Sequence, residues 1–269
     1  MAIIPSAFKT AVVPIGVRQA NSSVSWIGTG FFVIRKISQT EGLPFLISNR
    51  HIVEGKAQIT ICMKQQGSDV LRLADIDLLI TGTPVFSVHP DPKIDVAVIR
   101  LDPGFIISNQ LEFPSFDIDD NAMTMSELRA NGVDDGSLVH MLGFPLGLVN
   151  VNSKLPICRL GCIARMSEAQ VKESGSFLVD IQNFPGNSGS PVILRPDACA
   201  IQGTSNLMMS VLIGIIHSYI PYEDSLISGQ TNRVVEVRSE NSGIANAHPV
   251  DYIREIIDGI VPRFTPSTT

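Results

Sequence analysis

Short apolar segments separated by turn residues dominate this chain, and they constrain its fold more than any other feature. Each is rich in Val, Ile, Phe or Leu and is bounded by Gly, Pro, Asn or Asp, which is typical of strands in β-sandwiches and β-barrels. A first series comprises residues 11–17, 30–34, 45–48, 58–62, 70–73 and 95–101. A second comprises residues 137–142, 154–166, 176–181, 190–194, 211–220 and 233–237. The two series predict an all-β protein built in two halves.

The segment between the two series and the end of the chain have different patterns. Residues 102–135 are acidic and rich in turn residues, and they predict a connector with a short helix at 123–130. Helical periodicity is clear only within residues 248–258, where a proline stands near the expected helix start. The apolar positions of this C-terminal helix are Val250, Ile253, Ile256 and Ile257.

Composition narrows the classes of partner. The chain has 269 residues, of which 44% are hydrophobic and 17% charged, as in a globular protein. Its net charge of −6, without a basic cluster, argues against a nucleic-acid partner. The N-terminus lacks the pattern of a signal peptide, and the nearly apolar run at 207–220 is too short for a membrane helix. We therefore expect neither nucleic acid nor membrane as a partner.

The four cysteines are Cys62, Cys158, Cys162 and Cys199. Cys158 and Cys162 are close in sequence, but no second close pair completes a tetrahedral zinc site. We expect buried free thiols in a reducing compartment, and hence a cytoplasmic protein without metal or other cofactor.

A glycine-framed serine is the clearest chemical signal. Residues 184–191 read FPGNSGSP, a turn that exposes the hydroxyl of Ser188 and lets the N–H groups of Gly186 and Ser188 point at an oxyanion. His51, in ISNRHIV, supplies a base, and Asp95, in KIDVAV, supplies a carboxylate. A charge in so apolar a run is costly unless it is paired, which favours an imidazole partner for Asp95. The three segments predict a serine hydrolase.

Other residues compete for each role with weaker arguments. Ser190 lies at a strand entrance without a glycine on its far side, and the nearby acids Asp91 and Asp77 have more polar or less well-placed surroundings. A lone histidine is more often structural than catalytic, and we assign the structural interpretation to the histidines outside these motifs. They are His89, His140 and His248.

The ordered set of motifs resembles the chymotrypsin-fold (trypsin-like) serine proteases. Within them it is most similar to the bacterial HtrA/Deg-type and glutamyl-endopeptidase-like branches. The matching segments are GTGF at 28–31, SNRHIVEG, DPKIDVAVIRL, GFPLG at 143–147, GNSGSPV and SGIA at 242–245. The resemblance covers roughly residues 25 to 260, and the order His, Asp, Ser is more specific than any single motif.

This resemblance implies two six-stranded antiparallel β-barrels with a C-terminal helix and a cleft between the barrels. Residues 1–118 would form the barrel that carries His51 and Asp95. Residues 119–262 would form the barrel that carries Ser188, together with the helix, and residues 263–269 would form a tail. The implied activity is that of a serine endopeptidase, which cleaves protein or peptide substrates through an acyl-enzyme.

The resemblance also implies a role for each site residue. His51 would take the Ser188 proton and return it to the leaving amine, while Asp95 would fix the imidazole tautomer. The backbone N–H groups of Gly186 and Ser188 would form the oxyanion hole. Asn187 stands where trypsin-type zymogens have an acid, and an Ile-Val-Gly-Gly start is lacking, so activation by a cleaved N-terminus is not expected. The chain also has no room for the PDZ domain of HtrA enzymes.

Residues 214–219, GIIHSY, resemble the edge strand that binds substrate backbone in this family. Together with Gln182, the residues His217, Ser218 and Tyr219 are the expected substrate-binding set. His217 comes one position later than the acid-binding histidine of glutamyl endopeptidases, so only a bulge would give it that role. Otherwise it supports Asp95 or the core, and Tyr219 narrows the pocket. Gln182 and Asn183 provide no charged pocket floor, which predicts weak cleavage after Arg or Lys.

Two other classes of function compete with an active protease. A silent or latent homologue would use the same cleft to bind proteins, and a specific protein partner or activator would fit that hypothesis. A binding module needs none of the residues His51, Asp95, Ser188 and Gly186, so their joint presence favours catalysis. The order of the candidate residues along the chain argues against an α/β-hydrolase esterase, because that fold places its catalytic histidine last.

Overall fold

A computed structural model describes residues 4–150, 153–197 and 206–262. The strands are β1 (Val12–Arg18), β2 (Val24–Lys36), β3 (Gly42–Ser48), β4 (Gln58–Lys64), β5 (Leu71–Asp77), β6 (Leu79–Ile80), β7 (Thr83–Pro84), β8 (Phe86–Val88), β9 (Ala97–Arg100), β10 (Phe116–Asp117), β11 (Leu138–Gly143), β12 (Ile157–Arg165), β13 (Phe177–Asp180), β14 (Pro191–Leu194), β15 (Val211–Ile227) and β16 (Val234–Pro249). The helices are α1 (Ser6–Ala11), α2 (Arg50–Val53), α3 (Pro103–Ser108), α4 (Met125–Ala130), the 3-10 turn η1 (Pro145–Gly147), α5 (Glu168–Ser174) and α6 (Val250–Ile260).

The first half of the chain forms an eight-stranded sheet. Its order is β5-β4-β1-β2-β3-β9-β8, and β10 pairs with β2 in parallel while the other pairs are antiparallel. Six of the strands match the predicted series, whereas β8 and β10 were not predicted. The end strands β5 and β8 do not pair, so the hydrogen-bond ladder stays open. The reason lies in the chain between them, where β6 and β7 pair with each other in a separate two-stranded sheet. The first predicted barrel is therefore a curved sheet with an open seam.

The second half forms a closed six-stranded barrel, as predicted. Its order is β11-β12-β13-β16-β15-β14. Alternate residues of these strands point inward, as the period of two in a β-strand requires, and fill the barrel with apolar side chains. Val139, Ile163, Phe177, Val192 and Ile213 are among the side chains buried there.

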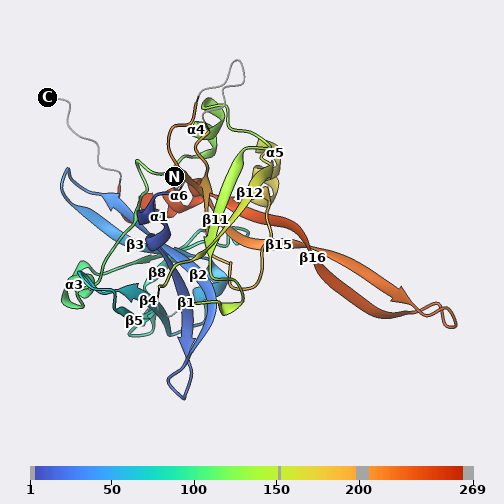
Figure 1. Cartoon of the computed structure of the whole chain (residues 1–269), viewed down its shortest axis with the longest axis horizontal. Coiled ribbons are helices and arrows are strands. Elements are labelled where there is room, and N and C mark those ends of the chain that lie inside the picture. The colour runs from blue at the N-terminus through green and yellow to red at the C-terminus, as the bar shows by residue number, and fades with distance from the viewer. Residues whose placement is uncertain (1–3, 151–152, 198–205, 263–269) are drawn as a thin grey trace.

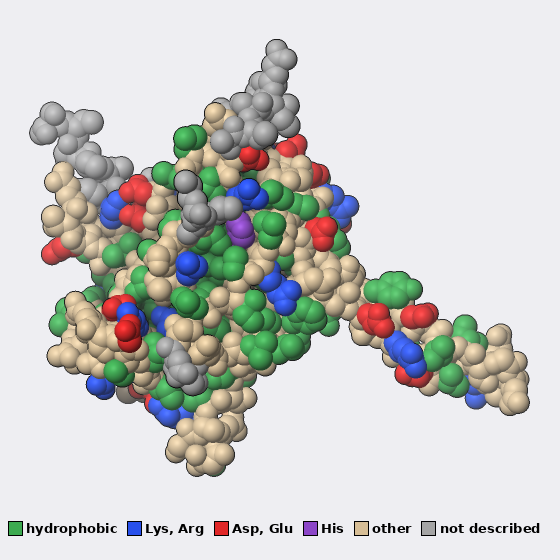
Figure 2. All heavy atoms as spheres, in the orientation of Figure 1, with side chains coloured by type: hydrophobic (Ala, Val, Ile, Leu, Met, Phe, Trp, Pro, Cys, Tyr) green, Lys and Arg blue, Asp and Glu red, His purple; other side chains and the backbone are tan. Residues whose placement is uncertain are grey.

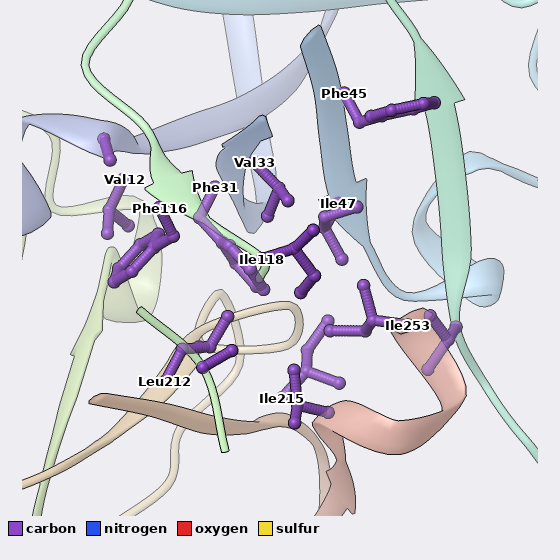
Figure 3. Packing of buried hydrophobic residues seen from close by; sticks show 14 of the residues in the cluster. Val12, Phe31, Val33, Phe45, Ile47, Phe116, Ile118, Leu212, Ile215 and Ile253 are labelled. Carbon is purple, nitrogen blue, oxygen red and sulfur yellow. The ribbon is translucent and has the colours of Figure 1, made fainter. Parts of the chain in front are cut away.

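Another cluster of buried side chains joins the two halves. Figure 3 shows Phe31 and Phe45 of the first sheet gathered with Leu212 and Ile215 of the barrel and Ile253 of α6. All five are fully buried, and burial of each large apolar side chain contributes about 1.5–3 kcal/mol to stability. The helix predicted near the C-terminus thus packs between both halves and fixes their relative position.

The strands β15 and β16 continue far beyond the barrel as one two-stranded hairpin, which projects into solvent at the right of Figure 1. The sequence predicted only residues 211–220 and 233–237 as strands here. The paired strands instead reach Ile227 on one side and begin at Val234 on the other. We refer to the part between Pro221 and Asn241 as the arm.

The described cysteines Cys62, Cys158 and Cys162 are free thiols. Cys62 is buried, as expected, whereas Cys158 is exposed, because its position on β12 points away from the barrel interior. Cys199 and the predicted tail at 263–269 lie outside the described residues. In the part of the chain that the structure describes, no helix is long and apolar enough to span a bilayer. Those same residues contain no cluster of three or more acidic, His or Cys side chains arranged to hold a metal ion.

Candidate active site

His51 lies on the short helix α2, directly after the apolar strand β3. Its side chain is 47% exposed, and its ring Nδ1 lies 2.5 Å from Oδ2 of Asp95. The backbone N–H of His51 also donates to Oδ1 of the same carboxylate, at 2.9 Å. One carboxylate therefore fixes both the helix turn and the ring. With Nδ1 donating to Asp95, the other ring nitrogen, Nε2, is left as a proton acceptor.

Asp95 lies between the buried residues Ile94 and Val96, just before β9. Burial by itself raises the pKa of the Asp95 carboxyl, but the hydrogen bonds from the ring and backbone of His51 outweigh it, so the pKa lies below its ordinary value. The main chain of Asp95 is anchored as well. Its carbonyl accepts from Asn49 Nδ2 at 2.8 Å, and its N–H donates to His248 Nε2 at 2.9 Å. The carboxylate is thus charged, and hydrogen bonds hold both its oxygens and the backbone that carries it.

Ser188 lies in a tight turn between β13 and β14. Asn187 N–H donates to the Phe184 carbonyl, and Ser190 N–H donates to the Asn187 carbonyl. The glycines on either side have positive φ angles, +95° at Gly186 and +89° at Gly189. A Cβ at Gly186 would lie 2.4 Å from the Phe144 carbonyl oxygen, so this position requires glycine for two independent reasons.

Thr29 of β2 joins this turn to the first half of the chain. Its N–H donates to the Ser188 carbonyl at 2.8 Å, and its hydroxyl donates to the Gly186 carbonyl at 2.7 Å. The Thr29 carbonyl accepts the hydroxyl of Ser48, at the end of β3. Since β3 leads directly into the helix of His51, the structure brings the Ser188 turn against the segment that positions His51.

Two N–H groups of the turn have no acceptor within the described residues. They belong to Gly186 and Ser188, the pair expected from sequence to form an oxyanion hole. Backbone N–H groups that lack a protein partner beside a nucleophile are suited to bind the negative oxygen of a tetrahedral intermediate. Ser188 Oγ likewise forms no hydrogen bond to another described residue, so the serine–histidine bond is not made in this state. Such bonds are often long in a ligand-free site and tighten when substrate binds.

Two further histidines lie on the inner side of Asp95. His248 is fully buried, accepts the Asp95 N–H at Nε2, and donates from Nδ1 to the Gly175 carbonyl at 2.8 Å. His217 stacks on it, with ring centroids 3.9 Å apart, and its Nε2 contacts Ser176 Oγ at 2.9 Å. Burial lowers the pKa of both rings, that of His217 to about 3. Both histidines are therefore neutral at pH 7.

Asp95, His248 and Ser176 form a connected network, but its geometry differs from that of a catalytic triad. His248 bonds the backbone N–H of Asp95 and leaves the carboxylate to His51. Ser176 is 2% exposed, which keeps its hydroxyl away from any substrate. The network instead holds the Asp95 loop from the buried side, through the hydrogen bond from the Asp95 N–H to His248 Nε2. Sequence analysis assigned His248 a structural role without finding this partner, and it missed Ser176 altogether.

The expected substrate-binding residues lie at one end of the barrel, where β15 leaves it. Ser218 is held from two sides, since its carbonyl accepts from Asn183 Nδ2 and its hydroxyl accepts from Asn246 Nδ2. Gln182 and Tyr219 are exposed. The register between β15 and β16 shifts between Ile216 and Ser218, so His217 occupies a bulge.

The bulge does not free His217 for substrate. Its Nε2 is engaged by Ser176 and its ring lies against His248, which agrees with the alternative that His217 supports the Asp95 loop. Of the rivals weighed from sequence, Ser190 is fully buried and His89 pairs with Glu255. Neither contacts His51 or Asp95 in the described structure.

The chain belongs to the trypsin-like peptidase domain family, whose model matches residues 28–198. Among solved structures, a Drosophila clip serine protease, Grass of the Toll pathway, is 13% identical, with a TM-score of 0.52 over 95% of this chain and 70% of that chain. The MamO protease domain of Magnetospirillum magneticum (apo form) is 15% identical, with a TM-score of 0.43 over 93% of this chain and 97% of that chain. No curated protein sequence matches the chain. The family and the first of these structures agree with the chymotrypsin-like fold expected from sequence.

Proposed function

We propose that the protein is a serine endopeptidase in which Ser188 is the nucleophile, His51 the general base and Asp95 the orienting carboxylate. The observation that carries the proposal is that the Asp95 carboxylate accepts hydrogen bonds from both the ring and the backbone N–H of His51. Beside it lies a turn in which two N–H groups have no acceptor among the described residues. A structural ion pair would not need a glycine turn of this shape next to it.

The reaction follows from these positions. His51 Nε2 accepts the Ser188 proton as Oγ attacks the carbonyl carbon of the substrate, and the new oxyanion is bound by the N–H groups of Gly186 and Ser188. Imidazolium then donates its proton to the leaving amine, which departs and leaves an acyl-enzyme. Water then attacks the ester carbonyl carbon while His51 Nε2 accepts its proton. His51 returns this proton to Ser188 Oγ as the acyl–oxygen bond breaks and the carboxylic acid product leaves. Asp95 stays ionised throughout and stabilises the imidazolium.

A fluorophosphonate probe tests the proposal directly, because it reacts only with a serine activated by a base and an oxyanion hole. We expect the wild-type protein to be labelled, and Ser188→Ala and His51→Ala to remain unlabelled. A Ser190→Ala variant is the matched control, since Ser190 lies two residues away, is buried and has no role in the reaction. Labelling of Ser188→Ala would refute the assigned nucleophile.

The competing hypothesis is a homologue that binds proteins in the same cleft without turnover or that awaits an activator. It is supported by the absence of a Ser188–His51 hydrogen bond among the described residues. It predicts a folded wild-type protein that the probe does not label. Cleavage of unfolded casein by the purified protein, without an added partner, would exclude latency.

A further inference from the structure

The arm is the largest feature of the molecule that catalysis leaves unexplained. A two-stranded hairpin is at best marginally stable in water, yet this one continues from Pro221 to Asn241, and nearly all of its residues are exposed among the described parts of the chain. Figure 1 shows it projecting away from the barrel. Large apolar side chains along it are exposed, with 59% of Tyr222, 58% of Ile227 and 67% of Val235 accessible. Exposed apolar surface of this kind is typical of a binding site.

The edge of β15 connects the arm to the nucleophile. Ile216 exchanges both of its backbone hydrogen bonds with the Ser188 turn, donating to the Ser190 carbonyl and accepting from Gly189 N–H. Beyond Ile216 the same edge has no strand beside it in the described residues, and it continues to Ile227. Alternate residues of β15 in the arm therefore direct N–H and C=O groups toward solvent along an edge that begins beside the Ser188 turn. This edge is interrupted at Pro221, which has no N–H, and the register shifts there and again between Leu226 and Ile227.

We propose that the arm binds, as an added third strand, the part of a protein substrate that lies upstream of the residues held at the barrel edge beside Ser188. The proposal rests on the proposed function, since it takes the acyl part of the substrate to lie on β15 at Ser188. A chain that lies there, and continues away from the cleaved bond, reaches the arm and can add to it as a third strand. Main-chain hydrogen bonds then supply affinity along the arm, and side chains supply preference.

The charges on the arm indicate which substrate segment fits. Between Pro221 and Asn241 there are four acidic residues, Glu223, Asp224, Glu236 and Glu240, against two basic ones, Arg233 and Arg238. Glu236 already pairs with Arg238, which leaves the acids near the base of the arm without an ion pair among the described residues. Figure 2 shows hydrophobic and acidic side chains together along the arm. A segment of alternating apolar and basic residues matches this surface.

The first test uses a labelled peptide of about 14 residues, long enough at about 3.3 Å per residue to lie along the cleft edge and the arm. The peptide alternates Thr or Val with Lys, and its binding to Ser188→Ala protein is followed by fluorescence anisotropy. In a short-arm variant, an Asn-Gly turn replaces residues 223–239 and joins the paired residues Tyr222 and Glu240. We expect removal of the arm to weaken binding at least about tenfold.

Two N-methylated forms of the peptide distinguish strand addition from general adhesion. In one form the even-numbered amides carry the methyl group, and in the other the odd-numbered amides do. In a third strand, only every second amide faces the arm. We therefore expect one form to lose binding and the other to keep it. Equal affinity of the two forms would overturn the proposal, and so would unchanged binding to the short-arm variant.

Further measurements distinguish other molecules that the arm could bind, and they test the proposed function separately. A peptide with Glu in place of Lys should bind more weakly, and the Glu223→Lys, Asp224→Lys protein should reverse that order. A dimer in light scattering that the short-arm variant loses would assign the edge to a second copy and overturn the proposal. Fluorophosphonate labelling should be the same with and without the arm. If labelling fails in both, the proposed catalysis fails, while the peptide measurements still decide what the arm binds.

Discussion

Asp95 contacts a histidine on each side, and the two are opposite in character. His51 is nearly half exposed and bonds the carboxylate, whereas His248 is fully buried and bonds the backbone N–H of the same residue. A ring at the surface, next to a charge, is able to accept and release a proton. A ring in the core that serves as acceptor for an amide must stay neutral. The difference shows that burial and the bonded group, rather than residue type, decide which histidine can be a catalyst and which an anchor.

The largest effect should follow from removing the outer histidine. We expect His51→Ala to lower kcat by a factor of roughly 10⁴–10⁶, as loss of the base does in comparable triads. Because the ring is half exposed, the thermal midpoint should change little. Peptide hydrolysis and a thermal melt measure the two quantities. A large loss of stability with modest loss of rate would reverse the roles that we assign to His51 and His248.

Asp95→Asn should have the next largest effect on rate. The amide keeps the size of the side chain but cannot hold the His51 tautomer that leaves Nε2 free, so kcat should fall by about 10⁴. The backbone bonds of residue 95 to Asn49 and His248 do not involve the carboxylate and should persist. Hydrolysis rates compared with Asp91→Asn, a nearby acid outside the network, check this. Equal losses in the two variants would contradict the assignment.

His248→Leu sharpens the comparison from the other side. It leaves the buried N–H of Asp95 without an acceptor, which costs about 1–3 kcal/mol in unfolding free energy. The rate of hydrolysis should fall less than in His51→Ala, because the His248→Leu substitution only displaces the Asp95 loop. Urea unfolding gives the stability, and His248→Gln, whose side-chain oxygen can accept a hydrogen bond, should recover part of it. A Gln variant no better than Leu would argue against the acceptor role.

The most gradual effect is on the pH dependence of stability. The pKa of His217 is about 3 in the folded protein and about 6.5 in an unfolded chain, so the unfolded state binds the extra proton first. The contribution of the neutral ring is fully present above pH 6.5 and is lost as the pH falls toward 3. Protonation of Asp95, whose pKa is lowered, adds to the loss at the acid end of this range. Urea midpoints between pH 7 and pH 4 should fall more steeply in the wild type than in His217→Gln.

Sequence patterns predicted the strands of the core better than those of the arm. The strands of the barrel alternate between buried and less buried residues, as β13 does, or are buried throughout, as β14 is, and their apolar content is visible in the sequence. In the arm both faces meet solvent, so alternation has no reason to appear, and Pro221 followed by acidic residues resembles a loop. The open seam of the first sheet was missed for a related reason, since short strands such as β8 carry little pattern.

The candidate site divides in the same way. Ser188, His51 and Asp95 lie in motifs whose local chemistry is distinctive, and sequence sufficed to propose them. The hydrogen bond from the Asp95 N–H to His248 joins residues 153 positions apart and uses a main-chain group. No pattern of side chains in the sequence predicts such a bond. The role of His217 depended on a bulge, and a one-residue register shift cannot be deduced from residue type.

The bonds of Thr29 have a consequence for how such a protein is made. This fully buried residue uses its N–H, hydroxyl and carbonyl to tie the Ser188 turn to β2 and β3, and its hydroxyl also accepts the Phe144 N–H. The turn that carries Ser188 thus has its full set of hydrogen bonds only when segments from both halves of the chain have docked. A nascent or partly unfolded copy holds Ser188, His51 and Asp95 but not the organised site. For the proposed protease, this would tie proteolytic activity to completed folding and would protect neighbouring chains during synthesis.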